Sequence, residues 1–196
     1  MYKNYVKRLL DLLGALMLLP IVCLLIVLVG PLIYMEDHGS IFYKAKRRGF
    51  HGQVFVMIKF RSMKMNAPDI RNSDNSTYNS PDDPRLTRIG RFLRKTSLDE
   101  LPQIVNILRG DMSFIGPRPV TVDKSLAELD EVRRKRIEVR PGITGFTQAY
   151  YRNSISQDLK LKYDAEYANN VSFIKDLKIF FKTIETVLRR KNIYQD

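Results

Sequence analysis

Cysteine and histidine are scarce in this sequence, and tryptophan is absent. The 196 residues include one cysteine, Cys23, and two histidines, His38 and His51. A single cysteine excludes an internal disulfide and a cysteine–histidine zinc cluster, and two histidines give little basis for a Ser-His-Asp triad. The signatures GxGxxG, GxxxxGK[ST] and HExxH are also missing, so neither a dinucleotide fold nor a P-loop is supported. If the chain is an enzyme that acts on phosphates, a carboxylate is the expected nucleophile or metal ligand.

Positive charge dominates what is present. Lysine and arginine number 33 against 21 acidic residues, which gives a formal charge of +12. A charge of this size indicates an anionic partner, whether a phosphate-bearing substrate, nucleic acid or an acidic membrane surface. We do not expect nucleic acid, because the cations lie beside a hydrophobic segment and no recognised nucleic-acid-binding motif occurs. The length suits one ordinary domain with an appendage.

The appendage is an apolar run near the N-terminus, residues 12–35, that contains no charged residue. As a helix rising about 1.5 Å per residue, it would reach across a hydrocarbon core about 30 Å thick. A cleaved signal peptide is one interpretation, because Lys3, Lys7 and Arg8 precede the run. The run is long for a signal, however, and no cleavage site stands out. A straight membrane-spanning anchor is the second interpretation.

A third interpretation places both ends of this run on the same side of the membrane. Basic residues flank the run on both sides, and such flanks favour the cytoplasmic face. Pro20 removes one helical hydrogen bond, and Gly30 with Pro31 offers a second break. We therefore expect residues 1–36 to form a re-entrant helix-break-helix in one leaflet and residues 37–196 to form a domain at the cytoplasmic membrane interface. The basic flanks are Lys3, Lys7, Arg8, Lys44, Lys46, Arg47 and Arg48.

Two short strands, residues 41–44 and 54–60, are predicted after the apolar run, with Gly49 and Gly52 supplying the turn between them. Residues 64–84 are rich in Asn, Asp, Ser and Pro and should form a loop, which is a candidate lid. Arginines then recur at three-residue spacing, as a drifting stripe on a helix. Such a stripe is either a solvated face or a surface that holds anionic groups. Its members are Arg85, Arg88, Arg91 and Arg94.

The stretch from Ser97 to Gln103 combines two signals. Ser97 and Glu100 have the spacing of a capping box, in which the serine hydroxyl accepts a first-turn amide and the glutamate bonds back. Apolar residues then recur at helical spacing, and Asp99 falls on the opposite face. A capping box accounts for Glu100 but not for Asp99, so the acidic pair is either a helix start or a reaction centre. The apolar positions are Leu98, Leu101, Ile104, Val105 and Leu108.

Three later stretches add predictions. Residues 116–119, Gly-Pro-Arg-Pro, form a stiff turn that would suit bidentate binding of phosphate by Arg118, although an ordinary exposed loop fits equally. Residues 123–139 read as a charged, mostly exposed helix that ends before Pro141. An amphipathic C-terminal helix would either pack on the core or lie on an anionic membrane surface. Its apolar stripe is Ile174, Leu177, Phe181, Ile184 and Leu188.

Five motifs occur in a fixed order along the chain. They are KRLLD at residues 7–11, KFRSM at 59–63, LDELPQ at 98–103, GDMSFIGPRP at 110–119 and RPGITG at 140–145. Together they closely resemble the bacterial sugar transferases, the monotopic phosphoglycosyl transferases. The resemblance covers almost the whole chain, and the ordered set is far more specific than any single motif. The chain is similar to a minimal member, with one membrane segment and one catalytic domain.

The resemblance implies transfer of a phospho-sugar from a UDP-sugar to polyprenyl (undecaprenyl) phosphate with release of UMP, the first membrane step of surface glycan or glycoconjugate synthesis. It implies that Asp99 is the nucleophile of a covalent phospho-sugar intermediate. Glu100 would help to place Mg²⁺ at the diphosphate, with both carboxylates as candidate metal ligands. Further candidates for binding the phosphates or the nucleotide, by the same resemblance, are Lys59, Arg118, Arg152 and Asp164.

The chain departs from the family pattern at two places. Pro20 stands earlier than the family's mid-run Ser-Pro, which moves the expected break in the membrane helix. Residues 150–153, Tyr-Tyr-Arg-Asn, stand where the family often has Asn-Gly-Arg-Asn, which leaves the sugar or nucleotide specificity open.

These features together predict an α+β fold, mostly helical with a small antiparallel β-hairpin, a re-entrant membrane helix and amphipathic interfacial helices. By resemblance, the protein belongs at the cytoplasmic face of the bacterial inner membrane, with UDP-sugar, polyprenyl phosphate and leaflet lipids as partners. The alternative is a non-enzymatic scaffold that binds anionic lipids through its basic face. Only the enzyme would release UMP in a Mg²⁺-dependent way.

Overall fold

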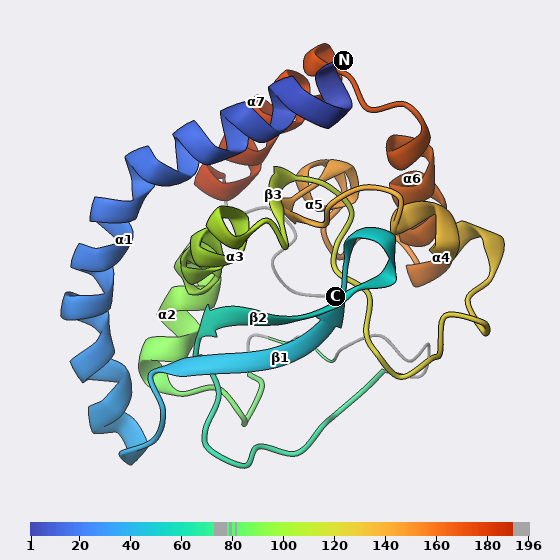
Figure 1. The fold of residues 1–196 in the computed structure, drawn as a ribbon. Helices are drawn as coiled ribbons and strands as arrows, with labels where there is room; N and C mark the ends of the chain where they lie inside the picture. The colour runs from blue at the N-terminus through green and yellow to red at the C-terminus, as the bar shows by residue number, and fades with distance from the viewer. Residues whose placement is uncertain (73–77, 79, 81, 190–196) are drawn as a thin grey trace.

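The computed structural model describes residues 1–72, 78, 80 and 82–189 (Figure 1). A π-helical turn, Tyr2–Val6, leads into the first helix, and two 3₁₀ segments span Phe50–Gly52 and Leu98–Gln103. The predicted class, mostly helical with a small antiparallel hairpin, is confirmed. The helices are α1 (Lys7–Asp37), α2 (Arg88–Thr96), α3 (Ile104–Arg109), α4 (Glu131–Arg136), α5 (Phe146–Tyr150), α6 (Gln157–Asn169) and α7 (Phe173–Leu188), and the strands are β1 (Phe42–Arg48), β2 (Val54–Phe60), β3 (Ser113–Ile115) and β4 (Gly142–Thr144).

Two small two-stranded sheets lie between α1 and the C-terminal helices (Figure 1). β1 and β2 pair antiparallel, from Phe42 opposite Phe60 to Arg48 opposite Val54, so β1 is longer than the predicted strand. β3 and β4 pair in parallel, which the sequence did not predict as a sheet. Their ends approach so closely that a Cβ at Gly142 would lie 2.1 Å from the Gly116 nitrogen. Glycine is therefore required at this crossing.

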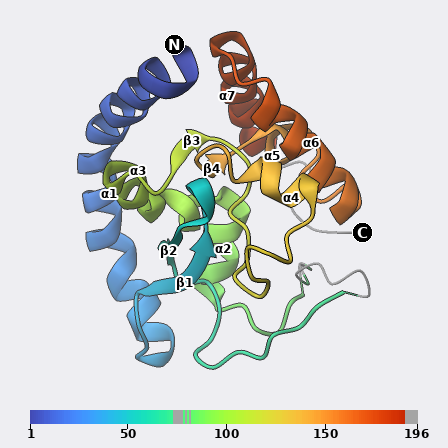
Figure 2. The same cartoon turned by 45° about the vertical axis from the view of Figure 1, so that its right-hand side comes forward.

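α1 runs without interruption from Lys7 to Asp37 and keeps both Pro20 and Pro31 inside it. The predicted break is thus absent from the helix, which instead curves around the domain (Figures 1 and 2). A proline inside a helix removes one backbone hydrogen bond and bends the axis, which accounts for a bend without a break. The re-entrant placement of α1 in a membrane stays a prediction.

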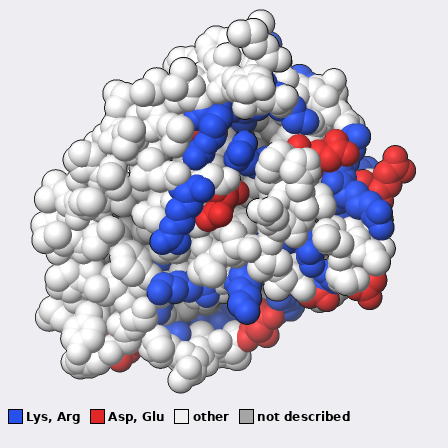
Figure 3. Space-filling model, in the orientation of Figure 1, with Lys and Arg blue, Asp and Glu red and all other residues white. Residues whose placement is uncertain are grey.

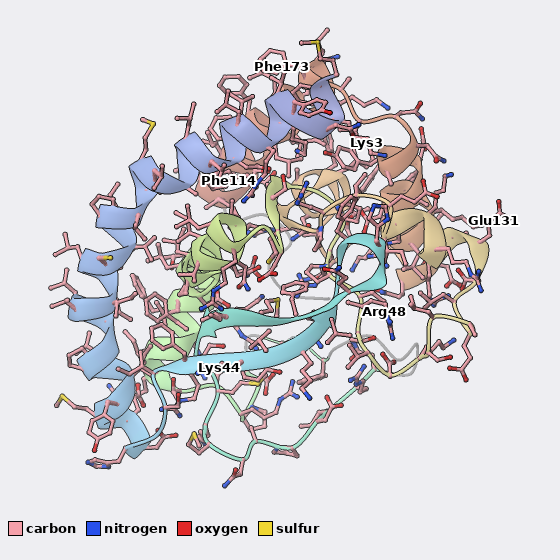
Figure 4. The ribbon with its side chains drawn as sticks, viewed as in Figure 1. Lys3, Lys44, Arg48, Phe114, Glu131 and Phe173 are labelled. Carbon is pink, nitrogen blue, oxygen red and sulfur yellow. The ribbon has the colours of Figure 1, made fainter. Side chains whose placement is uncertain are left out.

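One stripe of α1 belongs to the domain core, and the rest of the helix faces outward. The stripe packs against β2, α2 and α3 in two hydrophobic clusters. Figure 4 shows side chains on the convex side of α1 pointing away from the domain. By length and composition this helix is apolar enough to cross a membrane, and few of its side chains are buried. The buried stripe is Asp11, Ala15, Val22, Val29 and Ile33.

Polar bonds tie both ends of α1 to the same domain. Towards the N-terminus, Asp11 accepts hydrogen bonds of 3.0 Å from the Ser113 hydroxyl and the Phe114 N–H. Figure 4 shows Phe114 beside α1 and α3. At the other end, Asp37 pairs with Arg61 through two bonds of 2.6 Å. The membrane candidate is therefore anchored to the domain at each end.

α7 is amphipathic, and its apolar stripe does not pack on the core. Phe181 is 60% exposed and Leu188 is 77% exposed, whereas Ile179 on the other side is 2% exposed. The core-packing alternative is therefore wrong for this stripe, and a membrane-surface role stays a prediction. Asp176, on the buried side of α7, joins this helix to the N-terminus, which lies next to it in Figure 1. Its hydrogen-bond donors are Tyr2, Lys7 and Tyr167.

The prediction of one helix over residues 123–139 is wrong, because only α4 is helical there. The Asp130 side chain accepts the Arg133 N–H and so begins the helix at that point. Before it, Arg48 donates to the Lys124 carbonyl and holds the segment against β1 in an irregular path. This contact joins residues that are far apart in sequence, so the local spacing of charges could not predict it.

The loop predicted over residues 64–84 is confirmed where it is described, since that part contains no helix and no named strand. Residues 73–77, 79 and 81 of this loop lie outside the described residues. The lid role suggested for it stays a prediction.

Candidate active site

β2 and the 3₁₀ segment Leu98–Gln103 bring a lysine and a glutamate together. Side chains alternate along a strand, so Lys59 lies on the same face of β2 as Met57. Glu100 accepts a hydrogen bond from the Lys59 ammonium and forms a salt bridge with it. The two side chains are 13% and 22% exposed. A pair this shielded is only weakly screened by solvent, so it fixes where the Glu100 carboxylate points.

Asn106 holds this pair in register. Its buried amide accepts the Ile58 N–H at 3.1 Å and donates to the Val56 carbonyl at 2.8 Å and the Asp111 carboxylate at 3.0 Å. The two bonds to β2 satisfy the strand edge that β1 does not cover. Because α3 follows the 3₁₀ segment directly, Asn106 also sets the position of Glu100 relative to Lys59.

The predicted capping box at Ser97 is not formed, which corrects the expected helix start. Ser97 has φ 59° and ψ 16° and ends α2 in the left-handed region, with its N–H bonded to the Leu93 and Arg94 carbonyls, whereas an N-cap residue needs extended backbone. Its hydroxyl accepts a hydrogen bond of 3.0 Å from Arg152. Pro102 cannot donate the next helical bond, and regular α-helix begins only at Ile104.

The surroundings separate the two carboxylates chemically. Burial is the main cause that raises the pKa of Asp99 to about 6; Lys59 and Arg94 oppose the rise, and the negative charge of Glu100 adds to it. Burial also acts to raise the pKa of Glu100, but Lys59 and Arg118 outweigh it and the pKa is lowered. Glu100 is therefore held ionised, while Asp99 titrates close to neutrality.

A small cleft opens beside Glu100, and the neighbouring Asp99 is not among the residues that line it. Lys59, Glu100 and Arg118 line it together, with Arg118 supplied by the Gly-Pro-Arg-Pro turn. Arg152 is close enough that Glu100 acts to raise its pKa, although burial lowers it overall. Figure 3 shows a face on which lysine and arginine surround a small acidic patch. Other residues that line the cleft are Arg47, Met57, Gln103, Ile143 and Gln148.

The predicted arginine stripe is divided between three environments. Arg85 is buried outside α2 and pairs with Asp83 at 2.7 Å. Arg94 turns inward: its Nε donates to the Ser62 hydroxyl at 3.0 Å, and Asp99 acts to raise its pKa against the larger effect of burial. Arg88 and Arg91 are exposed. Arg94 is thus the stripe member that belongs to the site.

Asp164 lies behind the cleft and does not line it. Its buried carboxylate accepts hydrogen bonds from Arg136 at 3.0 Å and from the Thr147 hydroxyl at 2.8 Å. Arg136 also donates to the Arg118 carbonyl at 2.9 Å. The buried pair therefore supports the turn that carries Arg118, and the direct ligand contact suggested for Asp164 stays a prediction.

Arg136→Met is expected to destabilise the protein strongly, because it leaves the buried Asp164 carboxylate without its cation. Breaking a buried ion pair in this way typically costs about 3–5 kcal/mol. Adding Asp164→Asn should restore part of the loss, since the amide carries no charge to bury. Thermal unfolding in detergent compares the single and double variants. A Tm for Arg136→Met equal to that of the unmodified protein would contradict the prediction.

Sequence reasoning missed several residues at or behind the cleft. For Gln103 a signal existed, because it shares the polar face of the predicted helix with Asp99. No local pattern marks Arg47 or Gln148, which reach the cleft through the pairing of β1 with β2 and through the turn from β4 to α5. The polar face also contained Asn106, but its partner is the backbone of a strand far away in sequence.

Comparison with known proteins places the chain in a family. A family model described as bacterial sugar transferase matches residues 2–190. The chain belongs to the bacterial sugar transferase family. The resemblance drawn from the five ordered motifs is confirmed.

Relatives of this sugar transferase match it along nearly its whole length. EpsL of Bacillus subtilis strain 168, named an uncharacterized sugar transferase, is 41% identical over 189 residues, which cover 96% of this chain and 90% of EpsL. The undecaprenyl-phosphate galactose phosphotransferase of Salmonella typhimurium is 37% identical over 208 residues, 97% of this chain and 42% of that protein. The UDP-galactose-lipid carrier transferase of Erwinia amylovora is 38% identical over 209 residues, again 97% and 42%. The chain therefore spans less than half of the length of the Salmonella and Erwinia proteins, whose names state a substrate.

Proposed function

We propose that this sugar transferase moves a phospho-sugar from a UDP-sugar to polyprenyl phosphate and releases UMP. The observation that carries the proposal is the contrast between two adjacent carboxylates. Glu100 is paired with Lys59, whereas within the described parts of the chain no group bonds to the carboxylate of Asp99, which lies in the field of Arg94 and Arg118. The names of the Salmonella and Erwinia relatives, which mention undecaprenyl phosphate and UDP-galactose, support the same substrate classes.

The proposed reaction has two displacement steps at one phosphorus. First, an Asp99 oxygen attacks the phosphorus that carries the sugar; its bond to the bridging oxygen breaks, and UMP leaves with the electron pair. Second, a phosphate oxygen of the polyprenyl phosphate attacks the same phosphorus and the bond to Asp99 breaks, which regenerates the carboxylate. Each step brings anions together and requires cations already in place. Lys59, Arg94 and Arg118 meet this requirement.

The donor set at the site fits Mg²⁺. This ion binds proteins through one or two carboxylates together with substrate phosphates, and Asp99 and Glu100 offer two adjacent hard oxygen donors. Among the residues that the structure describes, no group of three or more His, Cys, Asp or Glu side chains is arranged to hold a metal ion by itself. When bound, Mg²⁺ would neutralise part of the diphosphate charge. Asp99 and Glu100 would hold it, and Lys59 keeps Glu100 ionised for this role.

The direct test of the function is release of UMP. Purified protein in detergent is offered a panel of UDP-sugars with polyprenyl phosphate and Mg²⁺, and UMP and the lipid product are measured. At least one UDP-sugar should give equal amounts of UMP and polyprenyl diphosphate sugar. A protein that only binds anionic lipid, the scaffold alternative, would release none.

Lys59→Met is expected to move the acid side of the pH profile to higher pH. In the unmodified protein kcat/KM should fall below about pH 6, because Asp99 has a pKa of about 6 and must be ionised to attack. Lys59 is the largest influence that lowers this pKa, so its removal raises it. Rates are measured against pH for both proteins, with the exposed Lys95→Met as control. An acid limb at the same pH in both would contradict the prediction.

We infer that the domain sits on the cytoplasmic face of the bacterial membrane with α1 inserted in one leaflet. Both ends of α1 are bonded to one domain through Asp11 and Asp37, and a straight span would separate those ends by a bilayer. Apolar side chains exposed along α1 and α7 provide surface for the hydrocarbon region. The reacting groups would then meet a soluble nucleotide and a membrane-bound phosphate.

Cysteine labelling in vesicles of known orientation tests this placement. In a Cys23→Ser background, Lys3→Cys and Glu131→Cys place single thiols at the N-terminus and in α4. Both should react with a membrane-impermeant reagent from the cytoplasmic side alone, because both lie on one domain. Reaction of the two positions from opposite sides would rule out the re-entrant arrangement.

A further inference from the structure

Gln148 of α5 carries a buried hydrogen-bond acceptor beside the cleft. Its Nε2 donates to the Ile143 carbonyl at 2.8 Å. This bond fixes which way the amide faces, because an amide oxygen cannot accept a hydrogen bond from a carbonyl. The Oε1 atom at the other end is buried and has no donor among the residues described. Buried polar atoms are nearly always hydrogen-bonded, so an exception in a side chain that lines the cleft indicates a ligand group.

The local backbone keeps this oxygen close to the Arg118 turn. A Cβ at Gly145 would lie 3.1 Å from Gln148 Oε1 and 2.2 Å from the Gly116 carbonyl oxygen. Glycine at position 145 therefore lets the turn between β4 and α5 press against Gly116, at the start of the Gly-Pro-Arg-Pro turn. As a result, Gln148 and Arg118 line the same cleft from two elements.

The rest of the cleft defines what Gln148 would recognise. Lys59, Arg47 and Arg118 are cations on the lining, and they suit phosphate oxygens. A neutral amide oxygen is an acceptor, so it repels phosphate oxygens and binds O–H or N–H donors. Gln148 therefore suits an O–H or N–H donor attached next to the phosphates, and the cations of the lining disfavour a positively charged one.

We propose that Gln148 Oε1 accepts a hydrogen bond from an uncharged donor of the nucleotide sugar, either a sugar hydroxyl or the uracil ring N–H. This inference rests on the proposed function, because it takes a UDP-sugar as the ligand. The correct substrate satisfies the buried oxygen, whereas an analogue without that donor leaves it unsatisfied and is rejected. Gln148 is thus a specificity-determining residue for the donor substrate and takes no part in phosphoryl transfer.

Substrate analogues combined with a side-chain variant test the proposal. The parent UDP-sugar is compared with analogues that each lack one sugar hydroxyl and with one methylated at the uracil N3. The unmodified protein should prefer the parent over one analogue by about 10- to 100-fold in kcat/KM, the factor that corresponds to one unsatisfied buried acceptor. Gln148→Met has a side chain of similar size but no amide oxygen. It should lose the preference because its kcat/KM for the parent falls towards its value for the analogue. The analogue that only the unmodified protein rejects shows which group, a sugar hydroxyl or the ring N–H, is the donor.

Controls separate recognition from packing. The N3-methyl analogue could be rejected because the methyl group clashes with Gln148 and not because it lacks the N–H donor. Gln148→Ala removes this clash and so separates the two effects. Gln157→Met, at an exposed position in α6, should leave both rate and preference unchanged, and thermal unfolding verifies that each variant is folded.

Three outcomes are decisive. A Gln148→Met variant that slows the parent and every analogue equally, or that leaves the preference intact, overturns the proposal. An unmodified protein that rejects no analogue by tenfold or more overturns it without any variant. Failure of the unmodified protein to release UMP from any UDP-sugar would instead defeat the proposed function, and this inference with it.

Discussion

Asp99→Asn is expected to lower the rate of UMP release by about 10⁴-fold or more, the scale seen when an enzyme loses its nucleophile. The amide has nearly the same shape as the carboxylate, but its oxygen is too weakly nucleophilic to attack phosphorus. Protein incubated with a sugar-labelled UDP-sugar in the absence of polyprenyl phosphate should acquire a phospho-sugar adduct, detected as an increase in mass. The Asn variant should acquire none.

The same substitution should not destabilise the fold, and this separates chemistry from structure. Burial raises the pKa of Asp99, which means that the folded state disfavours its ionised form. Above about pH 6 the ionised carboxylate therefore lowers stability relative to a neutral group, and Asn removes that effect. Tm at pH 7 should be unchanged or higher. Asp158→Asn, at an exposed position in α6, is the matched control. Full transfer activity in Asp99→Asn would refute the assignment of the nucleophile.

Local sequence patterns predicted the elements whose structure depends on near neighbours. The β1–β2 hairpin follows from two short runs typical of strands and two turn glycines, and the apolar run is helical as predicted, although without the expected break. Local patterns predict the wrong structure where contacts between distant residues determine it. Ser97 has the spacing of a cap, yet its backbone lies in the left-handed region at the end of α2 and its hydroxyl accepts a hydrogen bond from the distant Arg152. Spacing along the chain contains no information about that contact.

The candidate site divides in the same way. Asp99, Glu100, Lys59 and Arg118 were recognisable because ordered motifs contain them. The structure brings Glu100, Lys59 and Arg118 to one cleft, which Asp99 does not line. The supports were not recognisable from local spacing. Arg136 lies in a run of charges typical of a solvated helix, but it is buried because Asp164 on α6 and the Arg118 carbonyl both meet its guanidinium. Pairings between distant segments determine which charged residues are structural.

Glu100→Gln is expected to lower the rate by about 10²- to 10³-fold and to raise the Mg²⁺ concentration needed for half-maximal activity. The neutral amide is a weaker ligand for a hard cation, and it removes one of two carboxylates that would hold the ion. A loss of this order matches the removal of one preorganised electrostatic contact in other enzymes. The rate is measured against Mg²⁺ concentration for both proteins.

Glu100→Gln also tests which role the glutamate has, because the structure removes one explanation in advance. Since no capping box forms, the substitution cannot act by unfolding a helix start; what it removes is the charge that faces Lys59. Lys59→Met breaks the same ion pair and leaves the carboxylate in place. If the pair matters only for folding, the two variants should lose a similar amount of Tm. Both should then keep the Mg²⁺ dependence of the unmodified protein. If Glu100 binds the metal, the requirement for Mg²⁺ should rise more in Glu100→Gln than in Lys59→Met.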